Sequence, residues 1–176
     1  MSPILIVIFF AAVAVRIASV IVSKRHERIL RDEGAVEHGA LNTRLLALAH
    51  SLFYLAAFGE GWVRHAEFDG LSAIGLAIFV AALAMLVWIV RLLGPVWTVK
   101  IMIARNHPVS RHWLFRNLRH PNYFLNILPE LVGYSLIFHA WLTLMTGLPV
   151  YLVILIVRIV QEERAMRGLF GTASAS

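Results

Sequence analysis

The sequence predicts an all-α integral membrane protein with about five transmembrane helices, and three observations support that fold class. The chain of 176 residues is 60% hydrophobic and only 15% charged, which is too apolar for an ordinary soluble domain. Its apolar residues gather in five stretches. Its positive charges gather in alternate connections between stretches, as in a membrane protein with a fixed orientation. We therefore expect a single membrane domain over residues 1–176.

The five apolar stretches mark the expected helices. A bilayer crossing needs about 20 apolar residues, and the first three stretches come close to that length. The last two stretches are short and adjoin, so they are expected to form a helical hairpin. The stretches are Pro3 to Ser23, Leu45 to Trp62, Leu71 to Val90, Tyr123 to about His139, and about Trp141 to Val157.

The first polar segment predicts where one helix ends and the next begins. The first stretch has no charged residues before it and is too long for a signal sequence, so we expect a retained helix. The letters KRHERILRDEG predict that this helix continues into the cytoplasm until Gly34 stops it. Asn42 or Thr43 is the expected cap of the second helix.

The distribution of Lys and Arg predicts the orientation. Of these 16 residues, five lie in residues 24–44, six lie in residues 91–120 and three lie near the C-terminus. Because positive residues stay on the cytoplasmic side, the N-terminus is expected outside an inner membrane, with both long connections and the C-terminus in the cytoplasm. The membrane orientation thus accounts for the formal charge of +6, and we expect no nucleic-acid partner.

The connection of residues 91–120 is long, basic and aromatic, and it precedes the fourth helix. It carries six basic residues and no acid. We expect it to lie on the inner membrane face with Trp97, Trp113 and Phe115 in the interface. A long connection that is too apolar for disorder is usually functional, so this cytoplasmic loop is a candidate lid or binding loop.

The fourth helix begins with an unusual set of polar residues. Pro121 suits its first turn, and Tyr123, Asn126, Glu130 and Tyr134 follow at helical spacing on one face. Pro129 is expected to kink the helix where Glu130 enters. An ionisable group inside a membrane usually faces a partner or a wet cavity, so Glu130 marks a functional face.

The end of the fifth helix carries a matching set. Tyr151, Arg158 and Glu162 share a face, and Arg158 is expected to pair with Glu162 along the helix, whereas Glu163 falls on another face. In a hairpin these residues lie beside the start of the fourth helix. The sequence therefore predicts a polar pocket that opens to the cytoplasm.

Ordinary structural roles are the alternative for each of these residues. Arg158 and Glu162 can form an interface ion pair, and Tyr123 can belong to an aromatic belt. Those roles require neither a buried carboxylate nor a kinking proline, so the set together favours a functional site. His50 and Arg16 either line a substrate path or serve the structure, His50 as an interhelical hydrogen-bond donor and Arg16 by pairing or snorkelling.

These motifs resemble the isoprenylcysteine carboxyl methyltransferase family of membrane enzymes. The catalytic half of that family runs from Leu-Gly and Trp through a basic loop to Arg-His-Pro-x-Tyr and closes with Glu-Glu after the last helix. The N-terminal half is similar to a small bacterial branch whose members O-methylate alkylpyrones or alkylresorcinols. The matching residues here are Leu93, Gly94, Trp97, Thr98, Arg119, His120, Pro121, Asn122, Tyr123, Glu162 and Glu163.

The resemblance implies S-adenosyl-L-methionine as cofactor, bound by residues 91–170 beside three N-terminal helices in residues 1–90. Arg119 and His120 near a helix N-terminus suit the cofactor carboxylate. Glu162 suits the ribose hydroxyls, and Tyr123 suits the adenine. The expected cofactor-binding set is Arg119, His120, Pro121, Tyr123, Glu162 and Glu163.

The implied reaction is methylation of a lipophilic acceptor, most simply an alkylpyrone or alkylresorcinol hydroxyl. Methyl transfer needs two reactants held in line, without a metal or a covalent intermediate. An isoprenylcysteine-type carboxylate, a phospholipid amine, or a non-catalytic protein that binds anionic lipid are the alternatives, and the oligomeric state is open. The expected catalytic residues are Glu130, Asn126 and Arg158, with substrate residues His50, Arg16 and Trp97; no metal site is expected.

Overall fold

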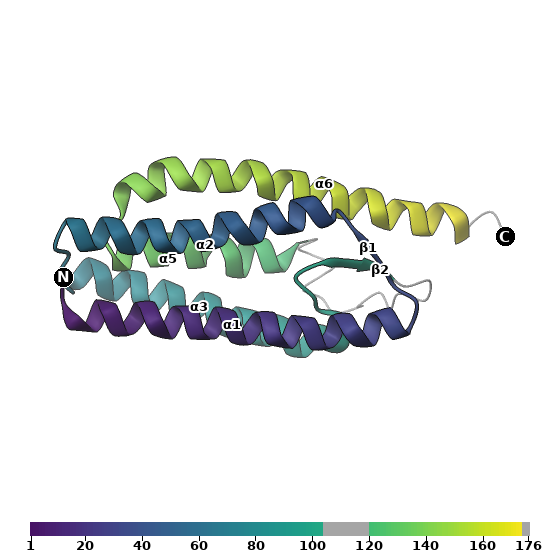
Figure 1. The fold of residues 1–176 in the computed structure, drawn as a ribbon, viewed down its shortest axis with the longest axis horizontal. Coiled ribbons are helices and arrows are strands. Elements are labelled where there is room, and N and C mark those ends of the chain that lie inside the picture. Colours follow the sequence, from purple (N-terminus) through teal and green to yellow (C-terminus); the bar gives the residue numbers. More distant parts are fainter. Residues whose placement is uncertain (104–119, 174–176) are drawn as a thin grey trace.

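A computed structural model describes residues 1–103 and 120–173, with side chains up to residue 164. Within these residues five helical rods run in alternating directions (Figure 1). The fourth and fifth rods each open with a π-helical segment. The rods are α1 (Pro3–Asp32), α2 (Ala40–Val63), α3 (Gly70–Leu93), η2 with α5 (Asn122–Ile127 and Leu128–Ile137), and η3 with α6 (Thr143–Gly147 and Leu148–Ala173).

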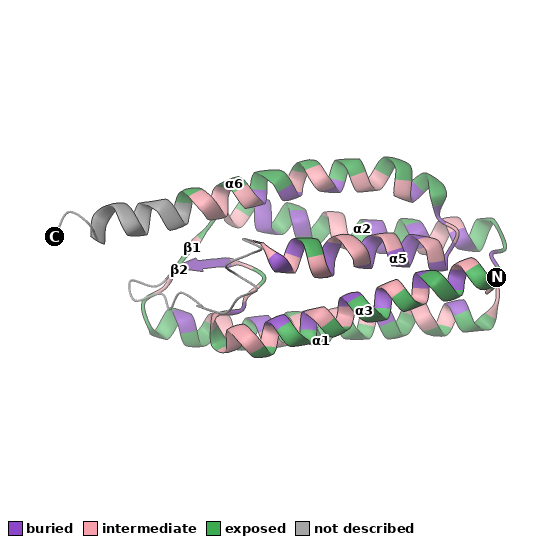
Figure 2. Cartoon of the chain, turned by 180° about the vertical axis from the view of Figure 1, so that it is seen from behind, coloured by how far each residue is buried: buried purple, intermediate pink, exposed green. Residues whose placement is uncertain are grey.

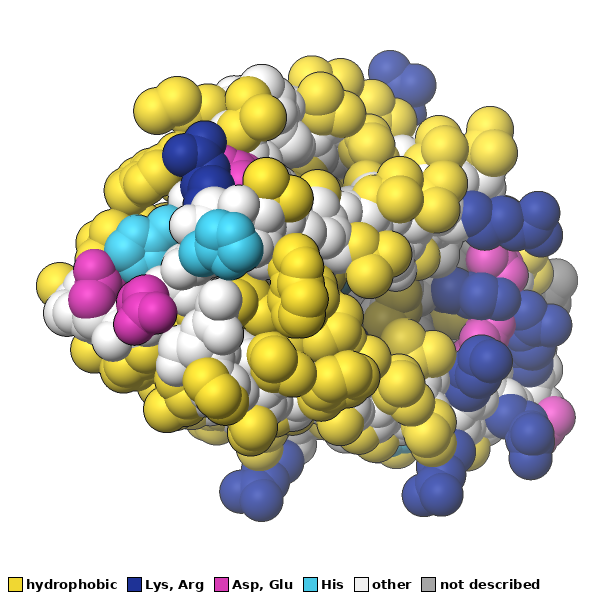
Figure 3. Space-filling model, turned by 60° about the vertical axis from the view of Figure 1, so that its left-hand side comes forward, with side chains coloured by type: hydrophobic (Ala, Val, Ile, Leu, Met, Phe, Trp, Pro, Cys, Tyr) yellow, Lys and Arg dark blue, Asp and Glu magenta, His cyan; other side chains and the backbone are white. Residues whose placement is uncertain are grey.

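The alternating rods separate the connections into two ends. The N-terminus, residues 64–69 and residues 138–142 lie at one end, and residues 33–39, residues 94–103 and the C-terminus lie at the other (Figure 1). We call the second the basic end. Figure 3 shows Lys and Arg gathered at that far end, His and acidic side chains at the near end, and hydrophobic side chains between them.

Four of the described helices are long and apolar enough to cross a membrane. They are Pro3–Asp32, Ala40–Val63, Gly70–Val96 and Thr143–Arg164. The fourth rod combines a six-residue and a ten-residue segment, so it is about 24 Å long against a hydrocarbon core of about 30 Å. Most residues of this rod are buried inside the bundle (Figure 2).

The end of α1 confirms that the first helix continues beyond its apolar stretch. The helix continues to Asp32, and Gly34 follows with a φ of +82°, a conformation that favours glycine. The cap expected at Asn42 or Thr43 is wrong, because α2 begins earlier and its N-cap is Gly39. Both polar side chains are buried and face α6, where the Asn42 amide donates to the carbonyl of Ile154 at 3.3 Å.

Glycine brings α3 and α5 close together. A Cβ added to Gly75 would lie 2.7 Å from the carbonyl oxygen of Gly133, and one on Gly133 would lie 2.7 Å from that of Gly75. The last two rods run antiparallel across a short connection, as expected for a hairpin (Figure 1). Each packs most closely on a different neighbour, α5 on α3 and α6 on α2. The polar face of α6 is therefore shared with α2.

Both π-helical segments end two residues before a proline. η2 ends at Ile127 and precedes Pro129, and η3 ends at Gly147 and precedes Pro149. Proline has no N–H to donate to the preceding turn, so the ladder accommodates an i→i+5 arrangement there. The irregularity expected at Pro129 is thus a π-helical turn that precedes Glu130.

A short antiparallel strand pair closes the basic end, and the sequence did not predict it. β1 (Val36–His38) pairs with β2 (Ile101–Ile103), with Val36 opposite Ile103. Lys100 makes salt bridges to Glu27 on α1 and, at 3.0 Å, to Glu37 on β1. The hydrogen bond and charge of Glu27, followed by those of Glu37, raise the pKa of Lys100 above its ordinary value. The segment before β2 is thereby attached to α1.

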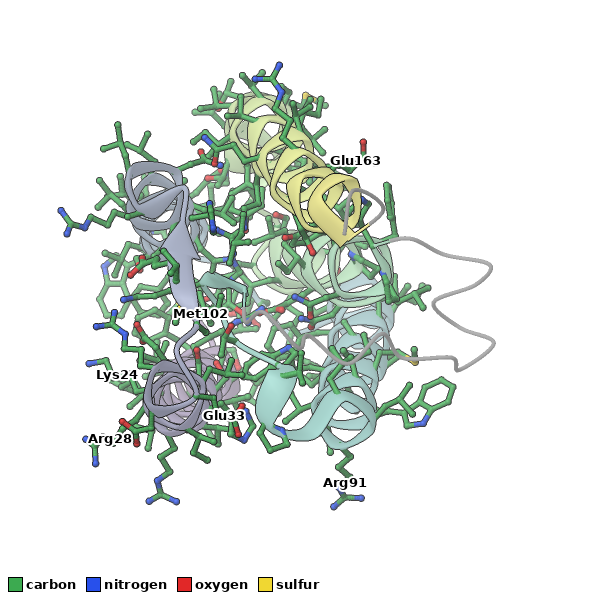
Figure 4. The ribbon with its side chains drawn as sticks, turned by 90° about the vertical axis from the view of Figure 1, so that its right-hand side faces the viewer. Lys24, Arg28, Glu33, Arg91, Met102 and Glu163 are labelled. Atoms are coloured by element: carbon green, nitrogen blue, oxygen red, sulfur yellow. The ribbon has the colours of Figure 1, made fainter. Side chains whose placement is uncertain are left out.

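Figure 4 looks onto this end of the bundle. Lys24, Arg28 and Arg91 point away from the helices, whereas Met102 on β2 lies over the centre of the bundle. Met102 is buried. β2 therefore covers the middle of the basic end.

Candidate functional site

The first group of functional side chains lies at the basic end, where the start of η2 meets the end of α6. We call it the His120 cluster, and it consists of His120, Tyr123, Arg158, Glu162 and Glu163. The predicted hairpin does bring these residues together. The Tyr123 hydroxyl donates to Glu162 Oε2 at 2.8 Å.

Arg158 is buried and binds three different elements, with 3% of its surface exposed. Its Nη1 donates to Thr43 Oγ1 on α2 at 2.5 Å, and its Nη2 donates to the carbonyl of Val99 at 2.6 Å. Its Nε donates to the Tyr123 hydroxyl oxygen at 3.3 Å. The guanidinium therefore fixes the segment before β2 against α2 and α6.

The direct pair expected between Arg158 and Glu162 is replaced by a bridge through Tyr123. The Tyr123 hydroxyl accepts from Arg158 and donates to Glu162. A hydroxyl can accept one hydrogen bond and donate another at the same time. Arg158 instead turns toward Thr43 and Val99, because α6 packs on α2.

His120 contacts both carboxylates at the end of α6. Its Nδ1 lies 3.6 Å from Glu162 Oε2, and its Nε2 lies 3.5 Å from Glu163 Oε1. Glu163 follows Glu162 on a different face of the helix, and the sequence did not predict that one imidazole would contact both. Contact with the Glu162 carboxylate, followed by that of Glu163, raises the pKa of His120 above its ordinary value.

Three other residues were predicted to belong to the site. Pro121 is the N-cap residue of η2, and Arg119 lies outside the described residues. The Trp97 ring is not in the membrane interface as expected, because it is buried against Leu86 and Ile89. The Trp97 carbonyl lies 2.8 Å from Nδ1 of His26. Trp113 and Phe115 also lie outside the described residues.

A second polar group surrounds Glu130 in the middle of the bundle. We call it the Glu130 cluster, and it consists of Arg16, His50, Tyr54, Asn126, Glu130 and Tyr151. Glu130 is fully buried, and Arg16 Nε donates to its Oε1 at 2.6 Å while Arg16 Nη2 pairs with Oε2. The pairing of Arg16 with a carboxylate, one of the two structural roles considered for it, is thus confirmed.

The remaining members complete the shell of the Glu130 carboxylate. The Tyr54 hydroxyl donates to Oε1, and His50 Nε2 lies 3.5 Å from the same oxygen. The Asn126 amide, oriented to match its neighbours, donates at 3.2 Å to Oε2 and to the carbonyl of Ala82. His50 Nδ1 lies 3.3 Å from the Tyr151 hydroxyl. The cluster thus joins α1, α2, α3, α5 and α6.

Sequence reasoning missed Tyr54 as a member of the Glu130 cluster and Thr43 as a partner of Arg158. Thr43, His50 and Tyr54 are spaced by seven and four residues, which places them on one face of α2. That spacing was a usable signal. The carbonyl of Val99 carries no such signal, because every residue has one.

The two clusters are connected along α6. Tyr151 and Arg158 are seven residues apart on one face, a rise of about 10 Å. About two turns of α6 therefore separate the two clusters. Cationic, anionic and neutral hydrogen-bonding groups are all present along this line.

The fold and the two clusters define a multi-pass α-helical membrane protein with two buried polar clusters inside the helical bundle. The chain belongs to the isoprenylcysteine carboxyl methyltransferase (ICMT) family, whose model matches residues 73–168. The family implies a membrane methyltransferase that uses S-adenosylmethionine. The matched residues include every member of the His120 cluster.

Two relatives match over most of the chain. A protein of Haemophilus influenzae with the name "Uncharacterized protein" is 48% identical over 162 residues, which cover 92% of this chain and 94% of the relative. The "Uncharacterized protein YpbQ" of Bacillus subtilis is 25% identical over 156 residues, which cover 86% and 90%. No solved structure matches the chain.

Proposed function

We propose that this protein is an S-adenosylmethionine-dependent methyltransferase that acts on a lipophilic acceptor at the membrane. The observation that supports this most directly is the His120 cluster. There an imidazole stands between two carboxylates, beside a tyrosine and a buried arginine. This set offers donors and acceptors to a zwitterionic ligand on adjoining helices, and the family match supports the same ligand.

The residues present fit this cofactor. His120 Nε2 is buried and makes no hydrogen bond to any residue that the structure describes, so it can donate to a carboxylate. Glu162 and Glu163 suit a ribose diol or an ammonium group, and the Tyr123 ring, which stacks on His120 with centroids 5.7 Å apart, suits the adenine. Arg119 and Pro121 would complete the part of the site that binds the carboxylate of the cofactor.

The cofactor supplies, when bound, an electrophilic methyl group on a sulfonium. The protein holds the acceptor in line with it and excludes water. Glu130 and Asn126 provide negative and dipolar groups near the reacting centre, and Arg158 fixes Tyr123 and Glu162. These roles require a rigid arrangement, and the hydrogen bonds of Arg158 and Asn126 supply it.

The acceptor we propose is an alkylpyrone or alkylresorcinol hydroxyl. Arg16 and His50 belong to the described polar cluster at mid-bundle, where a hydroxyl on an alkyl chain can reach them from the bilayer. Trp97 would border the substrate at the basic end. An isoprenylcysteine-type carboxylate or a phospholipid amine is the second candidate, since the matched family carries the first of these in its name.

A non-catalytic protein that grips anionic lipid is the candidate from another class. The outward-pointing Lys24, Arg28 and Arg91 favour it (Figure 4). Binding of an anionic headgroup does not require the fully buried Glu130 or the two carboxylates that contact His120. We therefore rank it below the methyltransferase.

Calorimetric binding of S-adenosylhomocysteine to the full chain in detergent tests the proposal. Wild type should bind saturably, and His120→Gln or Glu162→Gln should weaken binding about tenfold or more, since each removes a charge-assisted contact. His38→Gln and Glu67→Gln are matched controls at exposed positions and should bind like wild type. Absence of saturable binding by wild type would contradict the proposal.

A second experiment separates the acceptors. Purified protein is incubated with methyl-labelled cofactor and, in parallel, an alkylresorcinol, a prenylcysteine analogue or phosphatidylethanolamine. Label should enter the alkylresorcinol alone. Label in the prenylcysteine or the phospholipid would replace the proposed acceptor, and label in none would favour the lipid-binding candidate.

A further inference from the structure

The 97–100 segment, which follows η1 (Gly94–Val96) and precedes β2, is held by side chains of two different helices. The N–H of Val99 donates to Ser23 Oγ on α1 at 2.8 Å, and the carbonyl of the same residue accepts from Arg158 Nη2 on α6 at 2.6 Å. Both backbone groups of Val99 are therefore bound by side chains, one from each helix. Val99 is thus a direct link between α1 and α6.

One face of α1 binds this segment at three successive points. His26 Nδ1 lies 2.8 Å from the Trp97 carbonyl at the start of the segment, and Nδ1 donates there because a carbonyl can only accept. Ser23 binds the middle of the segment, and Glu27 forms a salt bridge with Lys100 at its end. The three α1 residues are three and four positions apart, which places them on one face of the helix. Their side chains therefore follow the course of the segment.

The contact between α1 and this segment is polar and directional. Within the described residues, the backbone of α1 packs more closely on η1, just before the segment, than on any other helical rod. In residues 21–32 only Ser23 and Leu30 are buried, and Ser23 is 4% exposed. A buried hydroxyl needs a hydrogen-bond partner, and the Val99 N–H is the partner from outside the helix.

We propose that Ser23 and His26 are positioning residues for Arg158 and, through Arg158, for the cofactor site. This inference rests on the proposed methyltransferase function, and it adds residues of α1 that act on the His120 cluster. Both residues precede residues 73–168, which match the family model. They act through the backbone of the 97–100 segment.

Arg158 depends on Val99 because its guanidinium is buried. Its Nη2 has the Val99 carbonyl as acceptor, and a buried donor that loses its acceptor is unfavourable. Only two soft torsions, φ and ψ of Val99, separate that carbonyl from the N–H that Ser23 binds. Release of the N–H therefore leaves the carbonyl free to turn away from Arg158.

A displacement of Arg158 reaches the cofactor site through Tyr123. Arg158 Nε donates to the Tyr123 hydroxyl oxygen at 3.3 Å, and that hydroxyl donates to Glu162 Oε2 at 2.8 Å. A guanidinium that turns toward a new acceptor shifts the hydroxyl and the carboxylate with it, because the three groups form one network. The affinity for the cofactor should therefore depend on the hydrogen bond that Ser23 makes.

Calorimetric titration of the full chain in detergent with S-adenosylhomocysteine tests the role of Ser23. Ser23→Ala should weaken binding about fivefold, because it removes the acceptor of the Val99 N–H. Ser23→Thr keeps a hydroxyl and should restore most of the affinity. Ser19→Ala is the matched control and should bind like wild type. Ser19 lies one turn earlier on α1, and its hydroxyl donates at 2.8 Å to the carbonyl of Arg16 on the same helix.

Two substitutions test His26 in the same titration. His26→Leu removes the donor to the Trp97 carbonyl and should weaken binding about threefold or more. His26→Asn places an amide N–H near the position of Nδ1 and should bind more tightly than His26→Leu. Wild-type affinity in His26→Leu would show that His26 positions nothing.

A double-variant cycle separates positioning from a general loss of stability. Ser23→Ala is introduced into wild type and into Arg158→Lys. If Ser23 acts through Arg158, the change should weaken binding about fivefold in wild type and less than about twofold in the Arg158→Lys background. A merely structural hydroxyl would weaken binding by the same factor in both backgrounds, and that result would overturn the inference.

Failure of the inference and failure of the proposed function give different results. Unchanged affinity in Ser23→Ala, with saturable binding by wild type, overturns the inference and leaves the methyltransferase standing. Absence of binding by wild type overturns the methyltransferase instead. Hydrogen exchange of the cofactor-free chain then tests the anchor itself, since the 97–100 amides should exchange faster in Ser23→Ala than in Ser19→Ala. Equal exchange in the two variants would show that Ser23 does not position this segment.

Discussion

Arg16 and Glu130 are 114 positions apart in the sequence and form an ion pair inside the helical bundle. Arg16 comes from the middle of α1, and Glu130 lies just after the π-helical turn of the fourth rod. The pair joins the first helix to the interior rod. A buried pair of this kind is costly to break from one side, because the remaining charge is left without a partner.

Arg16→Met alone should therefore lower the free energy of unfolding by about 3 kcal/mol or more. The double variant Arg16→Met with Glu130→Leu should recover most of that loss, since no charge is left buried. Thermal unfolding in detergent measures both. A single variant as stable as wild type would show that the pair adds nothing to the fold.

Gly75 and Gly133 should not tolerate even one added methyl group. Gly75→Ala places its Cβ 2.7 Å from backbone atoms of α5, so we expect a loss of about 1–3 kcal/mol. Gly59→Ala is the matched control, since a Cβ there meets nothing within 4 Å. Thermal unfolding should separate the two variants. Equal behaviour would mean that the helices move apart without cost.

His120 predicts a pH-dependent stability. Its folded pKa is raised above the ordinary 6.5 by Glu162 and then Glu163. The stabilisation is therefore fully present below about pH 6.5 and is lost as the pH rises through the folded pKa. The difference in unfolding temperature between wild type and His120→Gln should shrink from pH 6 to pH 9. A difference in unfolding temperature that grows with pH would contradict a raised pKa of His120 in the folded protein.

Arg158→Lys should weaken S-adenosylhomocysteine binding despite the retained charge. A lysine cannot reach Thr43, Tyr123 and Val99 together, so Glu162 and the segment before β2 lose their common anchor. We expect about a tenfold loss in calorimetry. Arg91→Lys, at a position that points away from the bundle (Figure 4), should bind like wild type. If Arg158→Lys binds S-adenosylhomocysteine as tightly as wild type does, Arg158 does not contribute to the cofactor site.

The orientation can be tested cleanly because the chain has no cysteine. Glu67→Cys and Glu33→Cys place single thiols at exposed positions on opposite ends of the bundle. With the basic end in the cytoplasm of an inner membrane, an impermeant maleimide should label Glu67→Cys in intact spheroplasts. It should label Glu33→Cys only after permeabilisation. The opposite pattern would invert the topology.

The helices and the polar face of the fourth rod were predictable from residue periodicity alone. Tyr123, Asn126, Glu130 and Tyr134 are all buried, although the π-helical turn of residues 122–127 shifts Tyr123 away from the α-helical phase of Glu130 and Tyr134. The neighbours of that face were harder to predict, because periodicity gives the face of a helix and not the order of helices around it. The partnership of Arg158 with Thr43 follows from the packing of α6 on α2.

Hydrogen bonds between side chains and backbone atoms could not be predicted from the sequence for a different reason. The carbonyl of Val99 accepts from Arg158, and its N–H donates to Ser23 Oγ at 2.8 Å. Both bonds depend on the path of a short segment that pairs with β1. Two strands of three residues leave too weak a pattern in a sequence to set that path.

The π-helical turn of residues 122–127 sets an angular offset in the fourth rod. A π turn holds one residue more than an α turn, and one residue corresponds to about 100° of rotation. Converting this π turn to an α turn with the same number of residues would turn His120 and Tyr123 about 100° away from α6 while Glu130 stayed on Arg16. The π conformation of residues 122–127 therefore sets the relative orientation of the two clusters, so the backbone geometry of this turn determines the site as much as residue identity does.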